Sequence, residues 1–235
     1  ALQKRFSLRT LKVINDFTAL ALALLTLPPA YRTQIGGESA CEHASIALVG
    51  PGTGLGVSGL IPHSDHGWSA ISGEGGHITL AAQTTLEYQV IDHIRQQYGH
   101  VSAERVLCGK GLVDLHLALS AIRQQPSAPD ITPMDIVQRA LTDHDADYLQ
   151  TLDMFTAFLG SVAGDLALTL GARGGVYIGG GIVPRLMGWF ETSCFRSRFE
   201  AKGRFTSYLQ KIPVWAIQSP DSPALWGAAN ALDNA

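Results

Sequence analysis

Gly50-Pro51-Gly52-Thr53-Gly54-Leu55-Gly56 is the stretch that decides the fold, because it joins two short apolar runs at residues 45–49 and 57–61. Apolar runs on either side of a glycine-rich turn predict a β-hairpin with a flexible tip. The turn lacks the Lys-Ser/Thr pair of a P-loop and the last glycine of a dinucleotide-binding loop, which excludes both of those motifs. Two interpretations stay open: the bare backbone N–H groups and the Thr53 hydroxyl approach phosphate oxygens, or the hairpin tip is merely flexible.

The segments around this hairpin alternate between strand and helix patterns. Further strands are predicted at residues 11–14, 68–71, 175–178 and 214–217, and helices at residues 17–27, 85–98, 112–123, 151–170 and 224–232. Strands and helices that alternate along one chain indicate an α/β protein. No internal repeat or low-complexity tract interrupts this order.

Local signals mark where several of these helices begin, end and pack. Gly99 should end the helix at 85–98, and Thr132, Pro133 and Asp135 are typical of an N-cap, a first helical residue and a third one. The apolar face of segment 151–170 contains Gly160 and Gly164, which would let a neighbouring segment approach closely. We therefore expect segment 151–170 to be a central buried helix.

Composition narrows the class of partner. A chain of 235 residues that is 46% hydrophobic can bury a sizeable core, and its net charge of −3 leaves no basic stripe for nucleic acid or anionic lipid. A small-molecule partner is the remaining expectation. The three cysteines form no CxxC motif, so we predict neither a disulfide framework nor a metal site, and a reducing cytoplasm fits best.

The basic residues near the start, followed by the apolar run 17–27, superficially imitate a signal peptide. Asn15 and Asp16 separate the basic part from the apolar part, and no A-x-A-like cleavage site follows. The run is also far shorter than the ~20 residues that cross a bilayer. A strand that leads into a buried helix, with no membrane partner, is the preferred interpretation.

Three polar groups could carry chemistry. Asn15 and Asp16 follow a predicted strand, where Asp16 could accept the proton of an attacking hydroxyl or could instead cap the next helix. Glu74 and His77 stand among three glycines, either as ligand-binding groups or as part of an exposed turn. Glu104 begins a short helix, where it could simply favour the helix dipole.

Residues 174–181 hold five glycines around a predicted strand, so the backbone must pass close to a ligand or pack tightly against its own chain. Both interpretations stay open from this segment alone.

Five ordered motifs, N-D-F-T-A, G-T-G-L-G, G-E-G-G-H, S-A-E-R-V-L and G-G-V-Y-I-G-G-G-I, together resemble the bacterial glucokinase family over essentially the whole chain. The resemblance implies an α/β protein of the actin-like, ribonuclease-H-like ATPase fold, in which two lobes meet at a cleft. The large lobe, residues 27–217, would be nearly complete and would bind sugar and nucleotide. Residues 1–26 and 218–235 would be the part of the small lobe that is present.

The same resemblance implies ATP-dependent phosphorylation of glucose at the 6-hydroxyl, the first step of glycolysis, in a cytoplasmic homodimer that uses ATP and Mg²⁺. By position, Asp16 would be the catalytic base, and the sugar would be bound by Asn15, Asp16, Glu74, His77 and Glu104. The nucleotide would be bound by Gly52, Thr53, Gly54, Gly179, Gly180 and Gly181. Charged acceptors suit a hydroxyl-rich ligand, and the residues alone do not select glucose among hexoses.

One family feature has no counterpart in these residues: a strand–turn–strand with an Asp and a Gly-Gly-Thr run that holds phosphate and metal. The resemblance therefore implies an amino-terminally truncated chain, whose activity is a separate question from its family. Two functions stay open, a hexose kinase and a catalytically silent sugar-binding module. Glucose-dependent formation of ADP would separate them.

Overall fold

A computed structural model describes residues 2–65, 67–125, 128 and 130–233. Within these residues the strands form one six-stranded sheet in the order β1-β6-β5-β2-β3-β4. The strands are β1 (Arg32–Gln34), β2 (Ile46–Pro51), β3 (Leu55–Pro62), β4 (Trp68–Ser72), β5 (Val176–Ile178) and β6 (Val214–Ile217). The central strands β2, β5 and β6 are parallel, and the others join antiparallel. This mixed sheet confirms the α/β class.

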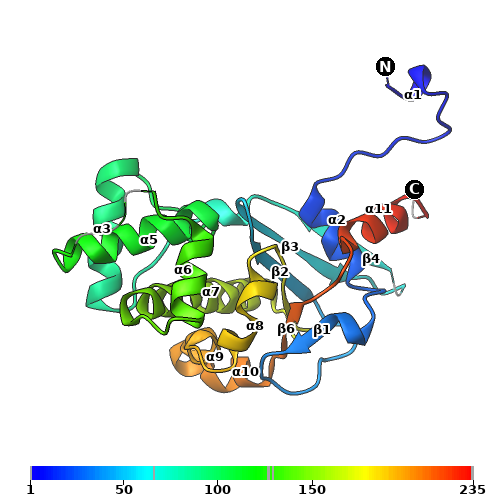
Figure 1. Cartoon of the computed structure of the whole chain (residues 1–235). Helices are drawn as coiled ribbons and strands as arrows, with labels where there is room; N and C mark the ends of the chain where they lie inside the picture. Colours follow the sequence, from blue (N-terminus) through cyan, green and yellow to red (C-terminus); the bar gives the residue numbers. More distant parts are fainter. Residues whose placement is uncertain (1, 66, 126–127, 129, 234–235) are drawn as a thin grey trace.

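Helices cover both faces of the sheet (Figure 1). One face packs against α3 (Thr85–Tyr98), α4 (Ala103–Val106), α5 (Gly109–Ile122), α6 (Pro133–Leu141), α7 (Ala146–Leu170), α8 (Met187–Phe190), α9 (Phe195–Glu200) and α10 (Thr206–Lys211). Among the described residues, the opposite face packs against α2 (Asp16–Ala23), α11 (Pro223–Asp233) and the 3-10 helix η1 (Pro29–Tyr31). Successive strand residues point to opposite faces, which places Val49 in the first core and Leu48 in the second.

The helices α2 and α11 cross at backbone distance. A Cβ added to Gly227 of α11 would lie 1.7 Å from the backbone oxygen of Ala19 in α2, so only glycine fits. Near the same crossing, Asn230 Nδ2 donates to the carbonyl of Leu22 at 3.5 Å. The position of α2 on the sheet therefore depends on α11.

The local helix signals are confirmed. Helix α3 has the predicted bounds and ends at Gly99, whose φ is 74°. Thr132 and Asp135 form a reciprocal capping box at the start of α6. Gly160 of α7 allows the close approach that its sequence position predicts, because a Cβ there would lie 2.3 Å from the Phe195 carbonyl oxygen of α9.

A buried ion pair adds to the contact between α3 and α9. Glu87 is 4% exposed at its side chain and pairs with Arg198, whose Nη2 lies 3.2 Å from Glu87 Oε2. Burial raises the pKa of Glu87, but the hydrogen bonds from Arg198 and from the Gln83 backbone outweigh that effect, so its pKa is lowered overall. The carboxylate therefore stays charged inside the fold.

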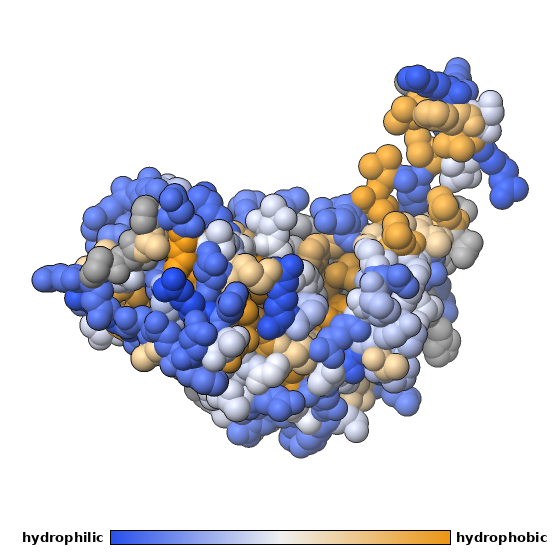
Figure 2. All heavy atoms as spheres, viewed as in Figure 1, coloured by the Kyte–Doolittle hydropathy of each residue, from blue (hydrophilic) through white to orange (hydrophobic). Residues whose placement is uncertain are grey.

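The strand predicted at residues 11–14 is wrong. These residues have no regular structure, and Figure 1 shows residues 2–15, which include the short helix α1 (Leu2–Arg5), running away from the body of the protein. Leu11 and Val13 are 43% and 86% exposed, and Figure 2 shows apolar atoms among hydrophilic ones on this arm. An apolar pattern alone does not make a strand, because a strand also needs a neighbour to pair its backbone groups.

Helix α7 is the one described helix that is long and apolar enough to cross a membrane by length and composition. Its apolar window is 78% buried within the protein, which matches the predicted central core helix.

Candidate active site

The amino-terminal end of α2 presents the first candidate residues. Asn15 is the N-cap, and its Oδ1 accepts hydrogen bonds from the backbone N–H groups of Phe17 at 2.8 Å and Thr18 at 3.2 Å. The structure thus gives the capping role to Asn15. Asp16 is exposed in the first turn, where the positive end of the helix dipole favours a negative side chain.

Phe17 fixes this helix end against the hairpin. Its ring fills the space beside Gly56, where an added Cβ would lie 2.0 Å from a ring carbon, and it also lies against Gly50. These two glycines face each other in the register of β2 and β3. The exposed Asp16 is therefore held beside the hairpin by its own neighbour in the chain.

The hairpin tip is tighter than the sequence indicates. The strands continue to Pro51 and Leu55, which leaves Gly52, Thr53 and Gly54 as the tip. Gly52 N donates to Gly54 O at 2.8 Å, and the first residue of α5, Gly109, donates its N–H to Gly52 O at 2.9 Å. The tip is thus hydrogen-bonded to the start of α5. The interpretation of the sequence as a merely flexible turn did not include this bond.

Glu104 reaches the same hairpin from α4. Ser102 caps this short helix, and Glu104 Oε2 accepts the backbone N–H of Leu55 at 3.0 Å. Its other carboxylate oxygen lies 3.9 Å from Nε2 of His77. Glu104 therefore does more than favour a helix dipole, because it joins α4, the hairpin and His77.

Glu74 and His77 lie on an exposed turn beside β3. The turn includes the 3-10 helix η2 (Gly75–His77), and the backbone of Gly76 packs directly on Leu55. A small hollow of about 40 Å³ next to this turn is lined by Asn15, Asp16 and Glu74, among others. The structure thus brings the candidate sugar-binding residues together around Leu55 and Gly56.

A second hollow, of about 380 Å³, lies on the other side of Asp16. Its lining includes Gly179, Gly180 and Gly181, which follow β5, and residues 219 and 221–224, which follow β6. The carboxyl ends of the parallel strands β2, β5 and β6 meet at this edge, where ligand sites of α/β sheets lie. Asp16 is the acidic residue that lines both hollows.

Sequence reasoning missed Ser219 and Asp221. Both line the larger hollow, and the side-chain oxygen of Ser219 is buried with no hydrogen-bond partner in the described part of the chain. Buried hydroxyls are normally paired, so this oxygen is suited to a polar group of a ligand. The signal available was positional: both residues follow the strand predicted at residues 214–217.

No group of three or more His, Cys, Asp and Glu side chains that could hold a metal occurs among the described residues. Mg²⁺ in nucleotide sites is bound by one or two carboxylates together with phosphate oxygens and water. Asp16 and Asp221 are the carboxylates that line the larger hollow, so the residues present fit a metal that is bound together with a nucleotide.

The sheet order, the ligand edge at the ends of parallel strands and the carboxylate between two hollows are compatible with a sugar kinase of the actin-like ATPase fold, and the comparisons with known proteins identify that class. Solved structures agree with this class: the glucokinase from an Antarctic psychrotroph superposes with a TM-score of 0.91 at 38% identity, covering 99% of this chain and 71% of that one. A ROK family glucokinase from Streptomyces griseus, solved with glucose and AMPPNP, superposes at 0.64 with 18% identity, covering 98% of this chain and 70% of that one, and shares the fold.

The family model described as Glucokinase matches residues 1–235, and the chain belongs to the glucokinase family. The glucokinase of Aromatoleum aromaticum is 52% identical over 236 residues, which is all of this chain and 70% of that protein. The glucokinase of Neisseria meningitidis serogroup B is 49% identical over 232 residues, or 99% of this chain and 70% of that protein. The chain thus spans about 70% of the length of these relatives.

Proposed function

We propose that this chain phosphorylates glucose at its 6-hydroxyl with ATP, in the first step of glycolysis, and that Asp16 is the catalytic base. Family membership and about 50% identity to glucokinases support the reaction. One observation carries the residue assignment: Asp16 lies between the hollow beside Glu74 and the hollow beside the glycines after β5. A base in that position faces the sugar on one side and the nucleotide on the other.

The proposed step needs positioning more than covalent chemistry. Asp16 accepts the proton of the 6-hydroxyl while that oxygen attacks the γ-phosphorus of ATP, and the bond from phosphorus to the ADP oxygen breaks. Asn15, Glu74, His77 and Glu104 would hold the sugar hydroxyls, because carboxylates accept strong hydrogen bonds and amide and imidazole groups can donate or accept them. A bound Mg²⁺ would neutralise phosphate charge, and Asp221 on the larger hollow is the carboxylate left to hold it when Asp16 acts as the base.

The nucleotide would lie in the larger hollow. Gly179, Gly180 and Gly181 would pass along the adenosine. Thr53 and Gly54 at the hairpin tip would donate N–H groups to phosphate oxygens, because the Gly52 N–H is already bonded to Gly54 O. Assignment of residues 27–217 to the large lobe, and of 1–26 and 218–235 to the small one, remains a prediction; residues 1, 234 and 235 lie outside the described part.

A cytoplasmic homodimer is likewise our proposal, and light scattering coupled to gel filtration tests its oligomeric state.

Two measurements on the same preparation test the function. Calorimetric titration with glucose measures binding, and a coupled assay measures glucose-dependent formation of ADP. Asp16→Asn should keep glucose affinity within a few-fold and reduce turnover by about 10²- to 10⁴-fold, the range for loss of a general base. Asp92→Asn, which changes a partly exposed carboxylate on α3 that pairs with Arg95, is the matched control and should change neither quantity.

Turnover by Asp16→Asn equal to that of the unchanged chain would refute the role of Asp16. Absence of glucose binding would refute the sugar site as a whole. Glucose binding without turnover in the unchanged chain would support the sugar-binding module instead.

A further inference from the structure

A third hollow, of about 740 Å³, lies on the sheet face that α2 and α11 cover only in part. Its lining includes Ile46, the first residue of β2, and Gly174 in the turn before β5, whereas the candidate active site lies at the opposite ends of these strands. The two sites share no lining residue. The hollow is therefore a separate site on the same sheet.

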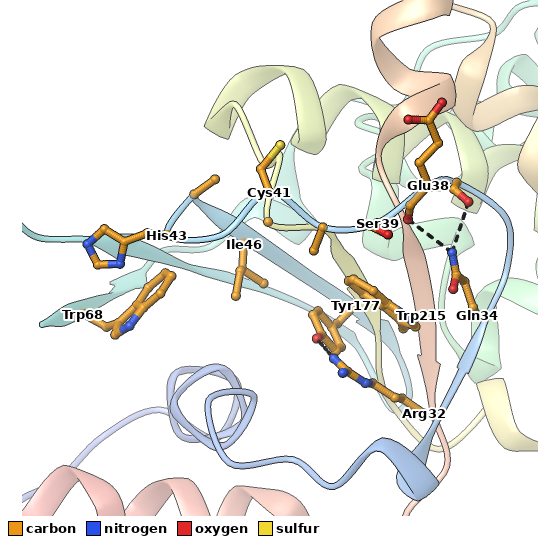
Figure 3. A pocket seen from close by; sticks show the side chains of 14 residues that line it. Arg32, Gln34, Glu38, Ser39, Cys41, His43, Ile46, Trp68, Tyr177 and Trp215 are labelled. Carbon is orange, nitrogen blue, oxygen red and sulfur yellow. Dashed lines mark hydrogen bonds between the residues drawn. The ribbon is translucent and has the colours of Figure 1, made fainter. Parts of the chain in front are cut away.

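One side of this hollow holds a cation on an aromatic surface. The guanidinium carbon of Arg32 lies 4.9 Å from the ring centre of Trp215 and 5.8 Å from that of Tyr177, and Arg32 donates a hydrogen bond to the Tyr177 hydroxyl. Burial raises the pKa of Tyr177, so the hydroxyl stays neutral beside the cation. Figure 3 shows the two rings and the guanidinium side by side at the wall of the hollow.

The cation has no acidic partner among the described residues. Glu38 lies on the loop that borders the hollow, and Figure 3 shows its carboxylate directed away from Arg32. On the other side of the same loop, Arg173 and Lys211 line a neighbouring hollow, and neither forms an ion pair in the described part of the chain. The local charge thus favours an anion beside Arg32.

The other side of the hollow is aromatic: His43 packs edge-on against Trp68, with ring centres 5.5 Å apart. Trp68 is partly exposed there, with Ile46 between it and Tyr177 (Figure 3). A ligand that fills the hollow needs a ring-shaped body to lie against Trp68 and Ile46, and an anionic group to reach Arg32. Sites of this kind combine apolar and aromatic walls with a few polar groups that fix orientation.

We propose that this hollow binds a phosphorylated sugar, with the phosphate on Arg32 and the sugar ring on Trp68. Phosphate suits the guanidinium because its fork of N–H donors matches the phosphate oxygens. The reaction product, glucose 6-phosphate, is the probe of choice, and only this choice rests on the proposed function. Binding there would let the product be sensed away from the catalytic cleft.

Calorimetric titration of the full chain with glucose 6-phosphate, in the presence of saturating glucose, tests the site. Arg32→Gln should weaken binding at least tenfold, whereas Arg204→Gln should leave it within twofold. Arg204 is the matched control, since its guanidinium carbon also lies over an aromatic ring, that of Phe205 at 5.2 Å, outside the hollow. Circular dichroism and the melting temperature of each variant check that the fold as a whole is retained.

A second variant separates the two ends of the ligand. Trp68→Ala should weaken glucose 6-phosphate severalfold and leave the weaker binding of inorganic phosphate within twofold, whereas Arg32→Gln should weaken both. AMP is the competing probe, and AMP binding that is tighter than glucose 6-phosphate and depends on Arg32 would overturn the sugar assignment.

Three results would overturn the site itself: no binding of glucose 6-phosphate, binding that glucose abolishes, or an unchanged affinity in Arg32→Gln. Glucose binding at the Asp16 site is measured separately on the same samples. Failure of this proposal is thus distinguishable from failure of the proposed function.

Discussion

Replacing Gly54 with alanine tests whether the hairpin tip positions Glu104 for the sugar. An added Cβ at Gly54 would lie 2.5 Å from Glu104 Oε2, so the carboxylate must retreat by about 0.9 Å to reach an ordinary contact of 3.4 Å. A retreat of that size directed away from Leu55 N would stretch the 3.0 Å hydrogen bond beyond hydrogen-bonding range. The backbone itself tolerates alanine, because the φ of Gly54 is not positive.

The expected cost to folding is modest. A hydrogen bond to a charged acceptor contributes about 1.5–3 kcal/mol, and Glu104 is 34% exposed, so solvent screening reduces the expected loss to about 1 kcal/mol. The displaced carboxylate would also miss its sugar hydroxyl. We therefore expect about a tenfold loss of glucose affinity, which corresponds to about 1.4 kcal/mol.

Urea unfolding measures the first quantity and calorimetric titration with glucose the second. Gly109→Ala is the control, because its Cβ would touch the same hairpin tip at Gly52 O with an ordinary contact of 3.8 Å. It should keep both stability and glucose affinity. Glucose affinity within twofold of the unchanged chain in Gly54→Ala would refute the positioning role of the tip.

Three further substitutions probe the body of the fold. Arg198→Met leaves the carboxylate of Glu87 buried without its partner and should cost about 3–5 kcal/mol in urea unfolding; a loss below about 1 kcal/mol would contradict this. Burial lowers the pKa of His116, so the unfolded chain binds protons more readily, and stability should fall as pH drops below the ordinary pKa value of 6.5. Thermal unfolding measured against pH should show this dependence, and His116→Gln should flatten it. Gly160→Ala forces a Cβ to 2.3 Å from a backbone oxygen of α9 and should cost about 1–3 kcal/mol, whereas Gly188→Ala, with open space around it, should be neutral; equal melting temperatures for the two variants would refute the close crossing.

Helix ends and buried central strands were predictable from the sequence because their signals are local. The Thr132–Asp135 capping box and the Gly99 stop each satisfy backbone groups with nearby residues, and the structure confirms both. Strand β1 (Arg32–Gln34) was missed, because three partly exposed residues carry no apolar alternation and owe their conformation to pairing with β6. The strand predicted at residues 11–14 was wrong for the same reason. Whether a segment forms a strand depends on a neighbouring strand that pairs with its backbone.

The candidate site was predictable where it coincides with ordered motifs and unpredictable where it depends on topology. Asp16, Glu74 and Glu104 stand in recognisable motifs, and their gathering around Leu55 follows from how β3 passes them. Ser219 belongs to no motif. It reaches the larger hollow only because β6 lies beside β5, and the sequence does not state that order.

The crossing of α2 and α11 has a consequence for how the protein is made. The contact between Asn230 and Leu22 joins residues 208 positions apart, so α2 leaves the ribosome long before the helix that seats it. During that interval the apolar side chains of α2 lack their cover, and the carboxylate of Asp16 has no fixed place beside the hairpin. Nascent chains that do not yet contain α11 should therefore engage chaperones through this segment, and the catalytic geometry should be among the last features to form.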